Sequence, residues 1–487
     1  MDQFENPETQ PTHLRPEKVA SSSSPLINIL AGVVLGVSLG WLIWTQLFSS
    51  PLDQVPWPER GLPLFVGRMM ELKEALKETP EWERRLYSAM LLDSPNDLPL
   101  AISWYEELAA NTSEPQIRVQ LAILEGESGR IEQVRQRVAE WDGWQEPYPQ
   151  FAQLLRIAYL NPSETTRDLN TKVIEEIDEP WFRQQLMARL FADDRVRVPS
   201  LGATKLSARS ARMLVLVRLF AAITLFITIA GSIGLFFLRS YSRLQPAALR
   251  MGTAPIPPCW SGPAGTAVFI RSGAIFILLT AGGGILEGRV GFSVPIIWLC
   301  VSLMSILACL DLAHRYLFKP VGLGIREGFG LSVPKARRGQ LLLWIASLLS
   351  AAALGGWGIV WISERLKLPI HWAESFDADF VWGSSSTVGL IGIHAVVFGP
   401  IFEELLFRGL LFATLRTKFD FGPAAILSAI MFSLIHGYGI AGFLSVAWTG
   451  VLWAWAYEKT GSLLPGVIAH GIHNFLWSSV LIAFLRG

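Results

Sequence analysis

Charged residues and cysteines are both scarce in this chain. Asp, Glu, Lys and Arg together make up 17% of its 487 residues, and 41 basic side chains balance 41 acidic ones. A net charge of zero gives no overall signal for binding nucleic acids or acidic partners. The cysteines number only three, Cys259, Cys300 and Cys309, and they offer neither a disulfide framework nor a paired-cysteine metal site.

Hydrophobic residues are abundant instead, at 51% of the chain, with a mean hydropathy of +0.37. These values are typical of membrane proteins that also carry a sizeable soluble part. Many of the 19 tryptophans stand near the ends of apolar runs, where their amphipathic rings suit the two interfaces of a bilayer. The composition therefore predicts a membrane protein.

The N-terminal end combines a polar segment with an apolar run. Residues 1–25 are polar, contain a run of serines and are predicted to be disordered. Residues 26–48 are apolar and long enough to cross a bilayer. A weakly acidic rather than a basic segment precedes this run, and no small-residue cleavage site stands out. We therefore predict an uncleaved membrane anchor rather than a secretory signal peptide.

Residues 50–210 differ from the rest of the chain because they hold most of its acidic residues. Their apolar positions recur at helical spacing, as at Trp104 and Leu108, and breakers such as Pro115 and Gly126 separate the runs. The pattern predicts a soluble α-helical domain of antiparallel helix pairs. It weakly resembles tetratricopeptide (TPR) repeats, although no regular period is present. A helical bundle without a catalytic role is the simpler interpretation, and a protein partner would bind here if the chain has one.

From Arg212 onward, apolar runs predict a series of membrane-spanning helices. With the N-terminal anchor they give an all-α fold, a polytopic transmembrane helix bundle of about eight or nine spans with an inserted soluble domain. A first group occupies residues 214–312, and a C-terminal region occupies residues 315–485. The runs lie near residues 214–238, 264–286, 292–312, 340–362, 386–412, 423–437, 441–457 and 462–485.

The charged loops predict how these spans are oriented. The segment 313–339 is rich in Lys and Arg and is predicted to be cytoplasmic, whereas 363–385 is mostly acidic and is predicted to face the other side. Counting back along the chain places the helical domain 50–210 outside the cytoplasm. We expect a multi-pass protein of a bacterial-type inner or plasma membrane, with its functional site opening to the cytoplasmic side.

One of the predicted spans carries three ionisable residues, Glu403, Glu404 and Arg408, between the apolar runs GLIGIHAVVFGPIF and GLLFATL. Each would cost about 2.5–3.5 kcal/mol if it faced lipid, so they are expected to face a protein interior or a water-filled cavity. A structural ion pair would explain one glutamate and the arginine. Glu404 and Arg408 are four residues apart and share a helix face. Glu403 points about 100° away and remains as the spare carboxylate.

Two further polar clusters occur in the following apolar segments. His436 lies one turn after Phe432, and His470 and Asn474 are four residues apart on one helix face. Taken alone, each histidine would be read as a hydrogen-bonded packing residue. Together with the spare carboxylate of Glu403, they predict a catalytic site. Glu403 with His436 would activate a water molecule as general base. His470 and Asn474 would donate hydrogen bonds to a developing oxyanion, which favours hydrolysis of a peptide bond within the membrane.

The order of these motifs resembles the CAAX prenyl endopeptidase family (CPBP), whose bacterial members form the Abi group of intramembrane proteases. The resemblance covers roughly residues 315–485 and rests on EExxxR, FxxxH and HxxxN in that order. It implies that the first glutamate and the motif-two histidine activate water, that the motif-three pair forms the oxyanion site, and that the second glutamate and the arginine support them. These roles map onto Glu403 and His436, onto His470 and Asn474, and onto Glu404 and Arg408.

Metal dependence stays open at the level of sequence. Glu403, His436 and His470 would make an open set of two histidines and one glutamate, as in catalytic zinc sites. No HExxH pair is present to support a local chelate, and members of the family are described both as metalloproteases and as glutamate proteases. Zinc is therefore expected only if the reaction is metal-dependent.

Three classes of function are compatible with an intramembrane polar cluster. The first is an endopeptidase acting on a membrane-associated protein or peptide. The second is a non-catalytic relative in which the same pocket binds a peptide, as an immunity or scaffold protein would. The third is a transporter, but no inverted repeat of broken helices relates the two halves. Nothing in the sequence indicates that a substrate would be prenylated.

Overall fold

The computed structural model describes residues 24–90, 96–161, 171–191, 201–290, 294–368 and 370–486. Within these ranges every regular element is a helix, which confirms the predicted all-α fold. Residues 1–23 of the predicted disordered N-terminus lie outside the described residues.

Eight of the described helices are long and apolar enough to cross a membrane, which confirms a polytopic, integral membrane protein. A further apolar helix, α19 (Phe421–Leu434), has 14 residues and is about 21 Å long, too short to cross the roughly 30 Å of hydrocarbon. The eight spans are α1 (Pro25–Phe48), Ala208–Tyr241 within α10 (Leu201–Leu244), α11 (Gly262–Val290), α12 (Val294–Ala313), α14 (Arg338–Arg365), the composite span Ser385–Leu415, α20 (Ile440–Thr460) and α21 (Leu464–Arg486).

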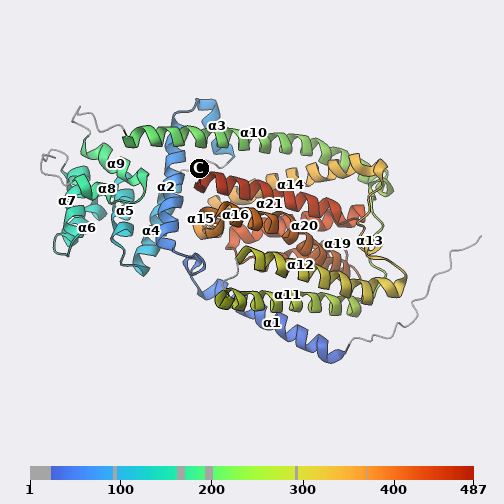
Figure 1. Cartoon of the computed structure of the whole chain (residues 1–487). Helices are drawn as coiled ribbons and strands as arrows, with labels where there is room; N and C mark the ends of the chain where they lie inside the picture. The colour runs from blue at the N-terminus through green and yellow to red at the C-terminus, as the bar shows by residue number, and fades with distance from the viewer. Residues whose placement is uncertain are drawn as a thin grey trace, which may run out of the picture.

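The helices between the first two spans gather at one end of the bundle (Figure 1). All of them except α3 (Glu81–Ala89) contribute to one hydrophobic core, in which Tyr105, Phe151 and Phe182 are fully buried. Trp372, from the short helix η8 (Trp372–Ser375) in the loop after α14, completes this core. Tyr87 of α3 packs in a smaller cluster with Leu76 and Ala221. The TPR resemblance stays a prediction. The helices are α2 (Pro58–Lys77), α3 (Glu81–Ala89), α4 (Asp97–Asn111), α5 (Pro115–Glu127), α6 (Ile131–Trp141), α7 (Tyr148–Leu155), α8 (Thr171–Glu175) and α9 (Pro180–Leu190).

This helical region is tied to the membrane bundle through α10. The helix begins at Leu201, inside the segment predicted as soluble, and continues without a break into the membrane (Figure 1). Arg218 of α10 donates two hydrogen bonds to Glu83 of α3, at 2.7 and 3.1 Å. Arg209 reaches Glu71 of α2 at 3.3 Å. The helix α10 and these ion pairs therefore connect the two parts.

The composite span Ser385–Leu415 lies inside the bundle and is not a regular α-helix. It consists of α16 (Ser385–Ile393), the π-helix η9 (His394–Phe398), α17 (Gly399–Glu403), the π-helix η10 (Glu404–Phe412) and α18 (Ala413–Leu415). Its apolar side chains from Leu405 to Phe412 pack into the largest core of the membrane bundle. Local π-helical segments often occur at functional sites, and here they adjoin the two glutamates.

Candidate active site

Residues of three separate apolar segments meet beside the composite span. Glu403 ends α17 and Glu404 begins η10, while His470 and Asn474 lie on α21, which packs against η9 and α17. His436 lies two residues after the end of α19. The fold thus gathers residues of all three sequence motifs in one part of the bundle.

Glu404 and Arg408 form the expected ion pair, and it is completely buried. Arg408 Nη1 donates to Glu404 Oε1 at 2.8 Å, and both side chains are 1% exposed. The guanidinium carbon lies 4.1 Å from the centre of the Phe432 ring, so a cation–π contact stabilises it as well. Glycines on the neighbouring helices leave space for the side chains of this pair. A Cβ at Gly466 would approach Glu404 Oε2 at 3.2 Å, and one at Gly450 would approach Arg408 Nη2 at 3.3 Å.

His470 bridges the two glutamates. Its Nδ1 lies 3.0 Å from Glu404 Oε1, and its Nε2 lies 3.5 Å from Glu403 Oε2. The ring stacks on Trp453 of α20, with centroids 6.0 Å apart and planes 20° from parallel. Because an ionised carboxylate only accepts hydrogen bonds, Glu404 holds the proton on Nδ1 and fixes the orientation of the ring.

Glu403 is the one carboxylate of this cluster that retains some exposure. Its side chain is 24% exposed, against 1% for Glu404. Arg408, which is bound to Glu404, does not neutralise it directly. The adjacent glutamates therefore occupy different environments, as the angle of about 100° between neighbouring helical positions predicts.

His436 is not in direct contact with Glu403. Within the described part of the chain, the only ion pair recorded for Glu403 is with His470. The Phe432 ring lies beside both imidazoles, with its centroid 4.9 Å from that of His436 and 5.9 Å from that of His470. His436 Nδ1 lies 2.8 Å from the Phe432 carbonyl oxygen. Since a carbonyl can only accept, Nδ1 donates this bond and the lone pair of the neutral ring lies on Nε2.

The side chain of Asn474 donates a hydrogen bond to a backbone carbonyl that Pro400 leaves without its helical partner. In η9 the Gly399 N–H donates to the His394 carbonyl, which is the π register. In that register the Ala395 carbonyl would accept from residue 400, but proline has no N–H. Asn474 Nδ2 donates to this carbonyl at 3.0 Å. Asn474 thus joins α21 to the irregular span, and the second hydrogen on Nδ2 is left for another acceptor.

The three candidate zinc ligands do not form a metal site in this arrangement. Among the described residues no group of three or more His, Cys, Asp or Glu side chains is placed to hold a metal ion. His470 Nε2 lies 3.5 Å from Glu403 Oε2, whereas the described residues show no ion pair between His436 and Glu403. As placed, the three donors do not meet at one point, and zinc dependence stays a prediction.

Sequence reasoning missed three contributors to this region. Trp453, which stacks on His470, carries no distinguishing pattern within its apolar helix. The Ala395 carbonyl belongs to the backbone, and it lacks a helical hydrogen-bond donor only because the helix is in the π register there. Gln46 of α1 donates to the Leu434 carbonyl at 3.1 Å, at the end of the helix that leads to His436. A glutamine inside a membrane anchor was a signal that could have been used.

The eight spans and the buried polar cluster define a membrane protein with ionisable residues at its centre, and comparison with known proteins gives its class. Residues 385–476 match the family model described as Type II CAAX prenyl endopeptidase Rce1-like. All three motifs fall within these residues. The C-terminal region is therefore similar to the CAAX prenyl endopeptidase family, as its motifs indicated.

A curated relative points to the same class. The "Putative membrane peptidase YdiL" of Bacillus subtilis (strain 168) is 25% identical over 179 residues, which cover 36% of this chain and 68% of the relative. No solved structure matches the chain. Together the family and the relative support a membrane protease.

Proposed function

We propose that this protein is an intramembrane endopeptidase that hydrolyses a peptide bond in a membrane-associated protein or peptide, with Glu403 as the general base. The observation that carries the proposal is the difference between the two glutamates. Glu404 is buried and bonded to Arg408 and His470, whereas Glu403 is partly exposed and lies against His470. A carboxylate in that position can accept a proton from a bound water molecule as it attacks the substrate.

The position of His470 supports a second role for this residue. Its Nδ1 lies 3.0 Å from Glu404 Oε1, and its Nε2 lies 3.5 Å from Glu403 Oε2. When Nε2 carries a proton, that N–H would stabilise the oxyanion of the tetrahedral intermediate.

Asn474 and His436 complete the proposed site from either side. The second hydrogen on Asn474 Nδ2 would serve as a further oxyanion donor, while the first one holds the Ala395 carbonyl. His436 presents the Nε2 lone pair, because its Nδ1 proton is used by Phe432. It would contact the water molecule or the leaving group once a bound substrate brings these groups together. Catalytic contacts often tighten when substrate binds.

The substrate class follows from the surroundings of the site. The candidate site lies within a bundle of membrane-spanning helices, so a membrane-associated protein or peptide is the proposed substrate. We place the protein in a bacterial-type inner or plasma membrane, in keeping with its relative from Bacillus subtilis. Within the family, a non-catalytic protein that binds a peptide in the same pocket is the competing function.

The test is a comparison of protein termini in membranes that contain the wild-type chain or Glu403→Gln. We expect a set of new N-termini that appears with wild type and disappears with the variant at equal protein abundance. Glu287→Gln is the matched control, because Glu287 also lies on a membrane-spanning helix but is exposed and outside the cluster. It should leave the set of termini unchanged. Identical termini for wild type and Glu403→Gln would favour the non-catalytic alternative.

A further inference from the structure

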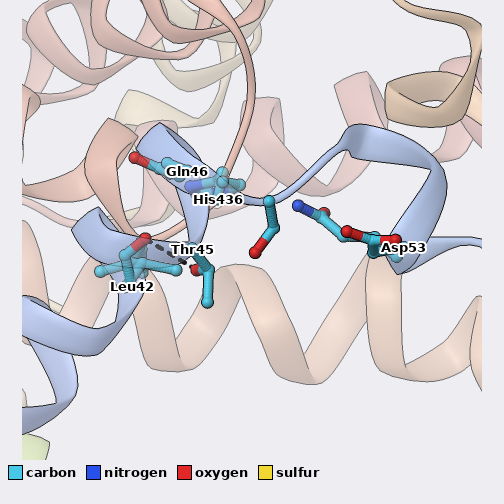
Figure 2. Close-up of a pocket in the computed structure, with 9 residues that line it drawn as sticks. Leu42, Thr45, Gln46, Asp53 and His436 are labelled. Carbon is cyan, nitrogen blue, oxygen red and sulfur yellow. Dashed lines mark hydrogen bonds between the residues drawn. The ribbon is translucent and has the colours of Figure 1, made fainter. Parts of the chain in front are cut away.

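A cavity of about 350 Å³ lies beside His436, between the end of α1 and the loop after α19 (Figure 2). This volume falls within the range of about 300–1,000 Å³ usual for binding pockets. The loop contributes Ile435, His436 and Gly437. The other wall comes from a part of the chain outside the family match, namely Leu42, Thr45, Gln46, Ser49, Asp53 and Gln54.

The end of α1 has a specific polar contact with this loop. Gln46 Nε2 donates to the carbonyl oxygen of Leu434, the last residue of α19. The Leu434 carbonyl also accepts from the Gly437 N–H at 3.4 Å, so the glutamine is a second donor to it at the end of the helix. Figure 2 shows the Gln46 side chain next to His436. The rest of α1 packs against α11, where Arg271 Nε donates to Asn28 Oδ1 at 2.8 Å. Gln46 is the contact that ties its C-terminal end to the loop beside His436.

The segment that follows α1 is also fixed in place. In η1 (Pro51–Gln54), Ser50 caps the turn and its backbone N–H donates to Asp53 Oδ2 at 3.0 Å. Ser50 Oγ donates to Glu107 of α4 at 2.6 Å, which ties the turn to the helical region. Asp53 is thereby held at the cavity with its side chain exposed.

The chemistry of the lining defines what the cavity would bind. It offers two side-chain amides, two hydroxyl groups, one imidazole and one carboxylate, and no lysine or arginine. Amides and hydroxyl groups pair with the N–H and C=O groups of an extended peptide. The carboxylate of Asp53 favours a basic side chain and disfavours an acidic one.

We propose that this cavity is a substrate subsite in which an extended peptide segment passes His436 and places a basic side chain opposite Asp53. The inference rests on the proposed function and deepens it, because α1 becomes part of the substrate-binding surface. The cavity lies at the end of the spans that carries the helical region, which is opposite to the 313–339 loop (Figure 1). The peptide therefore approaches from the side of the helical region, and not from the cytoplasmic side that the loop charges predicted for the opening.

The test uses binding, so that it does not depend on cleavage. Full-length Glu403→Gln protein in lipid nanodiscs is incubated with a pool of randomised decapeptides carrying a benzophenone group and then irradiated. Crosslinks are expected within residues 42–54 and 435–437. Crosslinked peptides should be enriched in Lys and Arg about two- to five-fold over the input pool, as is usual for a solvent-exposed charge pair. Crosslinks confined to other segments, or a composition equal to that of the pool, would overturn the proposal.

Further changes in the Glu403→Gln background test the role of charge. Asp53→Asn keeps an acceptor for the Ser50 N–H but removes the carboxylate, and Gln54→Lys adds a cation while leaving the turn intact. Both should abolish the enrichment in basic residues. Glu78→Lys, an exposed change at the end of α2 outside the cavity, should preserve it. An enrichment that survives both cavity changes contradicts the subsite. A protein that shows the enrichment but never cleaves would refute the protease and leave the subsite standing.

Discussion

Replacing Glu404 by glutamine should destabilise the protein far more than the same change at Glu403. Glu404 Oε1 accepts hydrogen bonds from Arg408 Nη1 at 2.8 Å and from His470 Nδ1 at 3.0 Å. Glutamine has nearly the same shape but no charge, so Arg408 would remain buried without its counter-ion. Removing one partner of a buried ion pair typically costs about 3–5 kcal/mol.

Two companion variants turn this expectation into a test of the site. Glu403→Gln alters a partly exposed side chain that Arg408 does not pair with, so its free energy of unfolding should change by less than about 1 kcal/mol. Adding Arg408→Met to Glu404→Gln removes the stranded charge. Since an apolar replacement of a buried pair is often neutral, the double variant should recover part of the loss.

The assay measures the unfolding of purified protein in one detergent, with intrinsic tryptophan fluorescence as the readout. Cleavage is measured on the same samples. Glu403→Gln should melt like wild type and cleave nothing, while Glu404→Gln should melt early. If Glu403→Gln proves to be the unstable variant and Glu404→Gln melts normally, the roles assigned to the two glutamates are reversed. If the loss of stability in the double variant equals the sum of the losses in Glu404→Gln and Arg408→Met, the ion pair does not stabilise the fold as argued.

Two further predictions concern other parts of the molecule. Burial raises the pKa of Glu179 to about 7 from its usual 4.5, so its contribution to stability is fully present below pH 4.5 and is lost as the pH rises through 7. The loss is about 3 kcal/mol. Glu179→Gln should therefore slow hydrogen exchange in α9 at pH 8 but not at pH 4.5, after correction for intrinsic rates, and equal exchange at pH 8 would contradict this. Asn474→Leu should leave the Ala395 carbonyl unpaired at a cost of about 1–3 kcal/mol. Adding Pro400→Ala supplies an N–H and should recover that loss of melting stability, whereas an unchanged loss would refute the proposed backbone role.

The sequence predicted those parts of the site that depend on spacing within one helix. Glu404 and Arg408 pair as their four-residue separation indicated, and Glu403 points elsewhere. The positions of eight spans also followed from the length of the apolar runs, whereas the span predicted at 423–437 is wrong, because that run forms the short helix α19. Both kinds of inference need only the geometry of a single helix.

Contacts between helices could not be predicted in the same way. The sequence placed Glu403 with His436, but helical periodicity does not say which faces meet, and in the structure Glu403 lies against His470 instead. The contact between Asn474 and Ala395 depends on a π register. A kink at Pro400 was expected, but the identity of the freed carbonyl depends on the register of the preceding residues. The domain boundary at residue 210 and the role of the helical region stay predictions.

Hydrolysis of an identified substrate in heavy-oxygen water is the most direct test of the central claim. A substrate from the comparison of membrane termini would be incubated with purified wild-type protein and with Glu403→Gln in H₂¹⁸O. If Glu403 activates water, wild type should place one heavy oxygen in the new C-terminal carboxylate of the product, and the variant should form no product. Labelled product formed by Glu403→Gln at the wild-type rate would contradict the account.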